Sequence, residues 1–106
     1  MSRRPKTWQD LIAIAELEPG DVTPVRFGTR DLAVYDAQVG IRVSLARCTH
    51  GAANLCDGYF DGRFIECPLH QGLFDVCDGA VKAAPARIPL RMVEARVVDG
   101  MVQVLL

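Results

Sequence analysis

The sequence predicts an all-β domain, built as a small sandwich or barrel of short antiparallel strands. Its strand-like runs are short, rich in Val and Ile, and below the ~10–12 residues of a typical helix. Asp-Gly pairs occur at 57–58, 61–62, 78–79 and 99–100. Because a type I′ turn needs positive φ at both central residues, Asp-Gly between apolar runs is a strong hairpin signal.

The elements follow in chain order. Segment Trp8–Leu17 fits an alternating strand and also a helical face, so we predict a strand followed by a short helical turn. Turns are predicted at Pro19-Gly20-Asp21 and Gly28-Thr29-Arg30-Asp31. The further predicted strands are Val22–Phe27, Leu32–Asp36, Ile41–Leu45, Phe64–Cys67, Gly72–Val76, Met92–Val98 and Met101–Leu105. The 106 residues predict one domain, 1–106, with residues 1–6 as a flexible tail.

Composition excludes several functional classes. The chain has 12 basic and 13 acidic residues and a formal charge of −1, which argues against a nucleic-acid-binding surface. No apolar run approaches the ~18 residues of a membrane span. Ser2-Arg3-Arg4 is similar to the start of a twin-arginine export signal, but no apolar stretch follows it. We therefore expect a cytoplasmic protein without membrane or nucleic-acid partners.

Two short motifs are the most informative feature of the chain. Cys48-Thr49-His50 and Cys67-Pro68-Leu69-His70 contain the only two histidines, each close to a cysteine. Two thiolates and two imidazoles are the ligand set of a Rieske 2Fe–2S centre. We therefore predict one such cluster, with Cys48 and Cys67 on one iron and His50 and His70 on the other. Gly51 and Gly72 would let the backbone approach the cluster closely.

The stretch Cys48–Pro85 resembles the Rieske-type ferredoxins of bacterial aromatic-ring dioxygenase systems, of the naphthalene, salicylate and anthranilate type. The resemblance rests on three segments, which are Asp57-Gly58-Tyr59, Glu66–Gly72 and Phe74–Cys77. It implies three small antiparallel sheets with the cluster at one tip, between two ligand loops and under a third loop that Ala83–Ala86 matches. One departure is Arg47, in a stretch where these ferredoxins usually carry Asp or Asn.

Two alternative interpretations remain. A Cys₂His₂ zinc site could hold a small β domain together with the same four ligands. The mixed Cys–His pairs, the glycines and the all-β pattern favour iron–sulfur. The chain could also be the small Rieske-type subunit of a larger oxidoreductase, of the nitrite reductase or arsenite oxidase type.

The other chemically active residues have structural explanations. Cys56 and Cys77 are expected to be buried free thiols. Ala53 and Leu69 occupy the positions where respiratory Rieske proteins carry the cysteines of an interloop disulfide, so no such bridge can form. The aromatic side chains expected in the core are Tyr59, Phe60, Phe64 and Phe74, and Trp8 is expected to pack in the core or at its edge. The aspartates expected to cap turns are Asp57, Asp61, Asp75 and Asp78; the alternative is that some of them attract a basic partner to the cluster.

The function predicted from these features is electron transfer. A third histidine for a mononuclear iron site is missing, as is a Gly-x-Gly-x-x-Gly dinucleotide fingerprint. The chain is therefore predicted not to be an enzyme but a carrier. The resemblance implies a flavin-containing ferredoxin reductase as donor and a terminal ring-hydroxylating oxygenase as acceptor, with this chain as a monomer. Gly72 and Phe74 cannot donate side-chain hydrogen bonds to the cluster, which predicts a low potential, about −150 mV.

Overall fold

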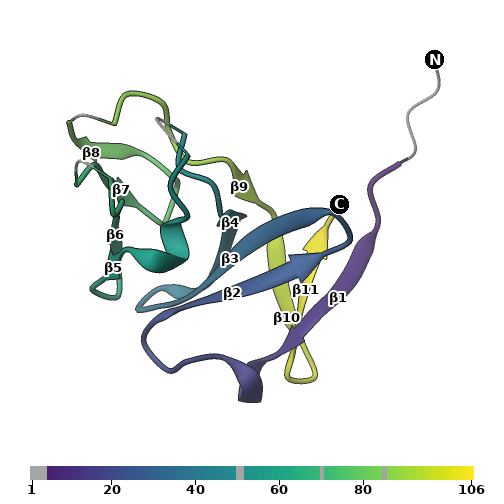
Figure 1. Cartoon of the computed structure of the whole chain (residues 1–106). Coiled ribbons are helices and arrows are strands. Elements are labelled where there is room, and N and C mark those ends of the chain that lie inside the picture. The colour runs from purple at the N-terminus through teal and green to yellow at the C-terminus, as the bar shows by residue number, and fades with distance from the viewer. Residues whose placement is uncertain (1–4, 50–51, 70, 85) are drawn as a thin grey trace.

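The computed structural model describes residues 5–49, 52–69, 71–84 and 86–106, and these form three antiparallel sheets (Figure 1). The basal sheet has the order β1 (Trp8–Ala13), β11 (Met101–Leu105), β10 (Ala95–Val98). The middle sheet has the order β2 (Val22–Phe27), β3 (Arg30–Ala37), β4 (Gly40–Leu45), β9 (Met92–Val93). The outer sheet has the order β5 (Tyr59–Phe60), β6 (Phe64–Glu66), β7 (Leu73–Asp75), β8 (Val81–Ala83). The all-β prediction is confirmed.

Most predicted strands are present, and three differences have local causes. The segment Met92–Val98 is not one strand, because the chain passes at Glu94 from β9, paired with β4, to β10, paired with β11. Strands β5 and β8 were not predicted, since two or three residues carry no readable alternation. Segment Trp8–Leu17 is a strand followed by the 3₁₀ turn η1 (Ile14–Glu16), as predicted.

The Asp-Gly turns divide into three kinds. Asp99-Gly100 has φ of 49° and 76°, as a type I′ turn requires, and joins β10 to β11. Asp61-Gly62 and Asp78-Gly79 also lie in hairpins, but only their glycines have positive φ. The prediction for Asp57-Gly58 was wrong. Asp57 ends the 3₁₀ turn η2 (Leu55–Asp57), and Gly58 is extended. Only glycine fits at position 58, because a Cβ there would overlap the Glu66 carbonyl oxygen.

Strand β3 separates two hydrophobic cores, because successive side chains point to opposite faces of a sheet. Leu32 and Val34 enter the basal core, between the basal and middle sheets, with Val102 and Val104. Ala33 and Tyr35 enter the outer core, between the middle and outer sheets. The remaining buried members of the outer core are Val22, Ala37, Ala46, Cys48, Ala53, Leu55, Phe60, Ile65, Cys67, Phe74, Val76, Ala86 and Leu90. Both faces of the middle sheet are therefore covered.

Four of the five predicted aromatics behave as expected and one does not. Phe60 and Phe74 are buried, Phe64 is half-buried on β6, and Trp8 is half-buried under the Arg96 guanidinium. Tyr59, in contrast, is 68% exposed, because Phe60 takes the core-facing side of β5 and its neighbour Tyr59 therefore points to the opposite face. The core tyrosine is instead Tyr35, whose hydroxyl lies 2.9 Å from the Ser44 hydroxyl. Burial raises the pKa of Tyr35 well above its ordinary value.

The outer sheet and its loops are inserted in the chain between β4 and β9. The chain leaves the middle sheet after Leu45 and returns at Arg91, where the Leu45 N–H donates to the Arg91 carbonyl over 2.9 Å. In Figure 1, β5–β8 accordingly lie together at one side of the molecule, away from β1, β10 and β11. Among the described residues, no helix is long and apolar enough to cross a membrane.

The predicted tail, residues 1–6, lies mostly outside the described residues. Pro5 and Lys6 are described and exposed. Thr7, next along the chain, is already anchored, because it exchanges two backbone hydrogen bonds of 3.1 Å with Leu106.

Candidate metal centre

The first ligand loop lies outside the sheets, and its described arms, residues 46–49 and 52–55, run antiparallel. Arg47 and Asn54 pair as an antiparallel bridge, and the Cys48 N–H donates to the Ala53 carbonyl over 2.9 Å. The Asn54 side chain accepts a 2.8 Å hydrogen bond from the Cys56 N–H, which caps η2. Backbone hydrogen bonds therefore fix the position of Cys48 at the start of the loop.

The second ligand loop, residues 67–72, connects β6 to β7. Pro68 disfavours a helical backbone at Cys67, and β6 ends one residue earlier, at Glu66. The Cys67 N–H donates to the Gly72 carbonyl over 2.8 Å, and Gln71 takes a positive φ of 61° to complete the reversal. Cys67 thus begins its loop in the same way that Cys48 begins the first.

A third loop, residues 84–90, contacts both ligand loops. The Thr49 hydroxyl donates to the Ile88 carbonyl over 2.6 Å, which ties the first loop to it. Gly72 packs against it from the second loop, since a Cβ at that position would lie 3.0 Å from the Ala86 Cβ. Gly72 was expected to allow a close approach to the cluster; in the structure its missing side chain accommodates Ala86. Pro85, part of the predicted third-loop motif, lies outside the described residues.

The two loops bring Cys48 and Cys67 together. Both side chains are buried, with exposures of 2% and 0%, and a hydrogen bond joins the two thiols. Burial, followed by the hydrogen bond to Cys48, raises the pKa of the Cys67 thiol to about 11, although the Leu69 N–H donates to its sulfur and opposes this rise. Without a cation, the Cys67 thiol is therefore neutral at pH 7.

This pair fits a metal centre. Two buried thiols in contact cannot both ionise without positive charge nearby, and iron or zinc supplies that charge and binds the thiolates. The Leu69 N–H, directed at the Cys67 sulfur, is the type of neighbouring donor that stabilises a metal-bound thiolate. His50 and His70 lie outside the described residues, so their assignment as ligands stays a prediction. Elsewhere in the described chain, no group of three His, Cys, Asp or Glu side chains could hold a metal ion.

The other two cysteines are separate from this pair in role. Cys56 and Cys77 are half-buried free thiols. Cys56 packs against the outer core, where burial, then the charges of Asp57 and Asp31, raise its pKa to about 11. A neutral thiol in an apolar setting is a packing residue, which is the role expected from the sequence.

The four aspartates have different surroundings. Asp61 and Asp78 are exposed and accept turn N–H groups, as expected. Asp75 caps the Cys77 N–H but cannot also dock a partner, because its side chain is 3% exposed and paired with Arg63 over 3.1 Å. Burial acts to raise the pKa of Asp75, but the Cys77 N–H and Arg63 outweigh it and lower the pKa overall. Asp57 is exposed within η2.

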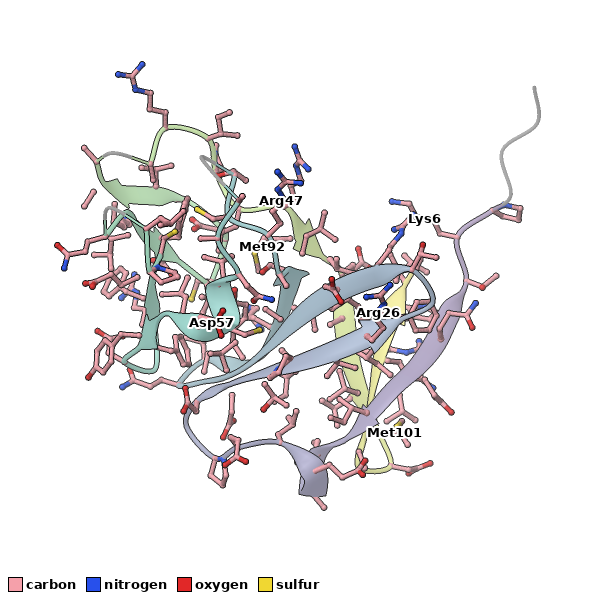
Figure 2. The ribbon with its side chains drawn as sticks, in the orientation of Figure 1. Lys6, Arg26, Arg47, Asp57, Met92 and Met101 are labelled. Atoms are coloured by element: carbon pink, nitrogen blue, oxygen red, sulfur yellow. The ribbon has the colours of Figure 1, made fainter. Side chains whose placement is uncertain are left out.

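Three residues that position the loops were not identified from the sequence. Thr49 hydrogen-bonds the first loop to the third, Asn54 caps η2, and Gly58 packs closely against Glu66. The position of Thr49 between the predicted ligands Cys48 and His50 was the one signal in the sequence that could have identified any of these residues. The partners Ile88, Cys56 and Glu66 could not be known before the fold. Arg47, the departure noted above, is exposed and points outward beside the first loop (Figure 2).

Comparison with known proteins agrees with this geometry. Residues 7–94 match the model of the Rieske [2Fe-2S] domain family. The ferredoxin component of a naphthalene 1,2-dioxygenase system from Pseudomonas aeruginosa is 47% identical over 78 residues, covering 74% of this chain and 75% of the relative. A ferredoxin of Sphingomonas yanoikuyae B1 superposes with a TM-score of 0.87 at 38% identity, over 94% of this chain and 99% of that one. The ferredoxin in a complex of reduced oxygenase and oxidised ferredoxin of carbazole 1,9a-dioxygenase superposes with a TM-score of 0.83 at 38% identity, over 92% of both chains.

An all-β fold with two cysteine-bearing loops at one side of an outer sheet defines a small iron–sulfur electron carrier. The chain belongs to the Rieske [2Fe-2S] domain family, and its cofactor is one Rieske-type 2Fe–2S cluster rather than zinc. Its place within the family is with the ferredoxin components, which are electron carriers and not catalysts.

Proposed function

We propose that this ferredoxin passes single electrons from an NAD(P)H-dependent flavin reductase to the terminal oxygenase of an aromatic-ring dioxygenase system. The observation that carries the proposal is the buried Cys48–Cys67 pair at the meeting of two loops. Support comes from relatives at 38–47% identity that are named ferredoxin components of naphthalene and anthranilate dioxygenase systems. The assigned ligands are Cys48 and Cys67 on one iron and His50 and His70 on the other.

The cluster, when bound, takes up and releases one electron. The protein's part is to hold it between the loops and to present it to partners. Cys48 and Cys67 are fixed by backbone hydrogen bonds at the start of their loops, so the thiolates need little reorganisation. Leu69 and Ile88, on the second and third loops, are 43% and 57% exposed. Their apolar side chains suit a contact surface that forms and dissociates with each electron.

We place its midpoint potential near the bottom of the Rieske range, about −150 mV. Side-chain donors to the cluster sulfurs would stabilise the negative charge that reduction adds. Gly72 has no side chain, and Phe74, which is fully buried in the same core as both cysteines, has no donor. Phe74→Tyr is expected to raise the midpoint in protein-film voltammetry, with Phe74→Leu as the control without a hydroxyl. In the wild type the potential should be nearly flat between about pH 6 and 8. A wild-type midpoint above zero would contradict this placement.

Reconstitution tests the proposed function directly. The purified protein, with two irons and two acid-labile sulfides per chain, should support product formation with a flavin-containing reductase, NADH and a naphthalene-type terminal oxygenase. Reduction by dithionite should give an EPR signal of low average g. Omitting this protein should abolish turnover. A coloured, reducible protein that supports neither reduction by the reductase nor oxidation by the oxygenase would overturn the assignment.

The ligand assignment has its own test. His50→Ala and His70→Ala should each remove or strongly change the cluster's visible spectrum, since each imidazole binds iron in this assignment. An unchanged spectrum in either variant would remove that histidine from the ligand set. We further propose that residues 1–106 act as one monomeric domain in the cytoplasm, which light scattering and cell fractionation would test.

A further inference from the structure

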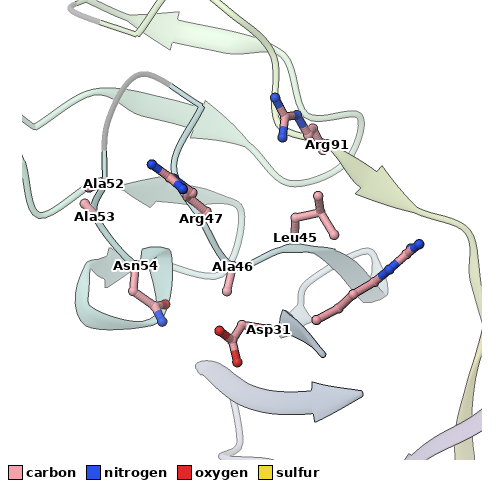
Figure 3. Close-up of a pocket in the computed structure, with 9 residues that line it drawn as sticks. Asp31, Leu45, Ala46, Arg47, Ala52, Ala53, Asn54 and Arg91 are labelled. Atoms are coloured by element: carbon pink, nitrogen blue, oxygen red, sulfur yellow. The ribbon is translucent and has the colours of Figure 1, made fainter. Parts of the chain in front are cut away.

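An open groove of about 470 Å³ lies beside the first ligand loop. It is bordered by the start of β3, by residues 45–47 and 52–54 of the two arms of that loop, and by Arg91 just before β9. In Figure 3, Arg47 and Arg91 stand on opposite sides of one end, with Leu45 and Ala46 between them and Asp31 at the other end. Arg47 immediately precedes Cys48, so the groove borders the loop that carries this cysteine.

The groove is strongly cationic, although the whole chain has a formal charge of −1. Arg30, Arg47 and Arg91 line it, and none of the three has an ion-pair partner among the described residues. Asp31 is the one acidic side chain in the lining, and it is already paired with Arg26 over 3.2 Å. Three guanidinium groups therefore face a groove in which the one carboxylate among the described lining residues is paired with an arginine outside the lining.

The chemistry of the lining indicates what the groove binds. A guanidinium presents parallel N–H donors that match a carboxylate, so arginines recognise this group better than lysines do. Between the arginines, the lining side chains Leu45, Ala46, Ala52 and Ala53 are apolar. Apolar surface of this kind suits the methylene groups of Asp and Glu side chains in a protein segment. The apolar side chains themselves make no favourable contact with a small hydrated anion.

We propose that this groove binds an acidic segment of a redox partner and so positions that partner at the metal centre. The proposal rests on the proposed function, since it assumes that a protein partner collects or delivers the electron. In this proposal the chain is the basic side of the contact and the partner the acidic side. The sequence suggested the opposite arrangement, in which aspartates of this chain would attract a basic partner. The three arginines come from distant parts of the chain, which is why the sequence alone does not reveal the groove.

Electrostatic docking of this type acts mainly on association, because complementary charge raises the encounter rate and makes it depend on salt. We expect Arg47→Gln with Arg91→Gln to lower the second-order rate constant for electron transfer with one partner by about tenfold at low ionic strength. The salt dependence of that rate should flatten in parallel. Anaerobic stopped-flow absorbance of the cluster measures both half-reactions, with the flavin reductase and with the naphthalene-type oxygenase.

Two further variants make the test specific. Arg30→Gln with Arg91→Gln leaves Arg47 in place, so a loss of rate there cannot come from a changed charge next to the cluster. Lys82→Gln removes one positive charge from β8, outside the groove, and should change the rate by less than about twofold. Unaltered rates and salt dependence in both double variants, with both partners, would overturn the docking proposal. If the wild type exchanged electrons with neither partner, the proposed function would fail first, and the groove's role with it.

Discussion

The two ligand loops close in the same way but are supported differently. In both, the cysteine N–H donates to a carbonyl further along its own loop, from Cys48 to Ala53 and from Cys67 to Gly72. The first loop is supported by polar contacts, namely the Asn54 cap and the Thr49 hydrogen bond to Ile88. The second is supported by the β6–β7 pairing and by close packing of Gly72. Equivalent cysteine positions can therefore be reached by hydrogen bonding or by packing, and the loops should fail under different substitutions.

The largest effect should come from the cysteines, where the loops are equivalent. Cys48→Ser and Cys67→Ser should each abolish the visible 2Fe–2S absorbance, because each removes one thiolate from the buried pair. Cys56→Ser and Cys77→Ser are the matched controls and should keep it. Loss of absorbance in a folded control variant, or its survival in Cys48→Ser, would show that the ligand pair is wrongly chosen.

The next largest effect is expected at Gly58, which follows the first loop and packs against β6, the strand that leads into the second loop. In Gly58→Ala, the new methyl group would overlap the Glu66 carbonyl oxygen, which β-pairing holds in place. We expect a loss of about 3 kcal/mol in the free energy of unfolding, measured by urea denaturation with circular dichroism. Gly20→Ala is the control, because this glycine has open space around it but a φ of 68°, so its substitution causes backbone strain without overlap. It should lower the free energy of unfolding by less than Gly58→Ala does. Equal losses would remove the overlap argument.

A smaller effect should separate the second loop from the first. Gly72→Ala places a Cβ 3.0 Å from the Ala86 Cβ, so the third loop must shift by a few tenths of an ångström. We expect about 1–2 kcal/mol of destabilisation. Ala86→Gly combined with Gly72→Ala removes the facing methyl group and should recover part of the loss. Without any recovery, the contact with Ala86 would not be what constrains Gly72.

The smallest effect should come from the polar brace of the first loop. Thr49→Val keeps the shape of the side chain but deletes the 2.6 Å hydrogen bond to the Ile88 carbonyl. We expect about 1 kcal/mol of destabilisation and faster loss of the cluster to a chelator, followed by its absorbance. Thr49→Ser retains the hydroxyl and should stay close to the wild type. If the serine and valine variants lost the cluster at the same rate, the hydrogen bond would have no bracing role.

The sequence predicted the parts of this protein that depend on local pattern. The strand bounds of β2 and β11, the Asp99-Gly100 turn and the two cysteine-bearing loops follow from alternation, turn chemistry and motif spacing. What it could not predict depends on tertiary contact. Tyr59 is exposed because its neighbour Phe60 takes the core-facing side of β5. Asp57-Gly58 forms no hairpin because Asp57 ends η2 and Gly58 packs against Glu66. The arginine groove likewise exists only after β3, the first loop and the segment before β9 have met.

The two cores also differ in when they can be completed as the chain is synthesised. The outer core is built from residues 22–90, so every strand it needs has emerged before β10 and β11. The basal core needs Val102 and Val104, and β1 pairs with β11 in the described structure, as in the Trp8–Leu105 contact. Contacts so distant in sequence close late, because the entropy of the intervening chain opposes them. We therefore expect the nascent chain to assemble the outer core with its metal-binding loops first. Strand β1 then stays unpaired until β11 has been synthesised.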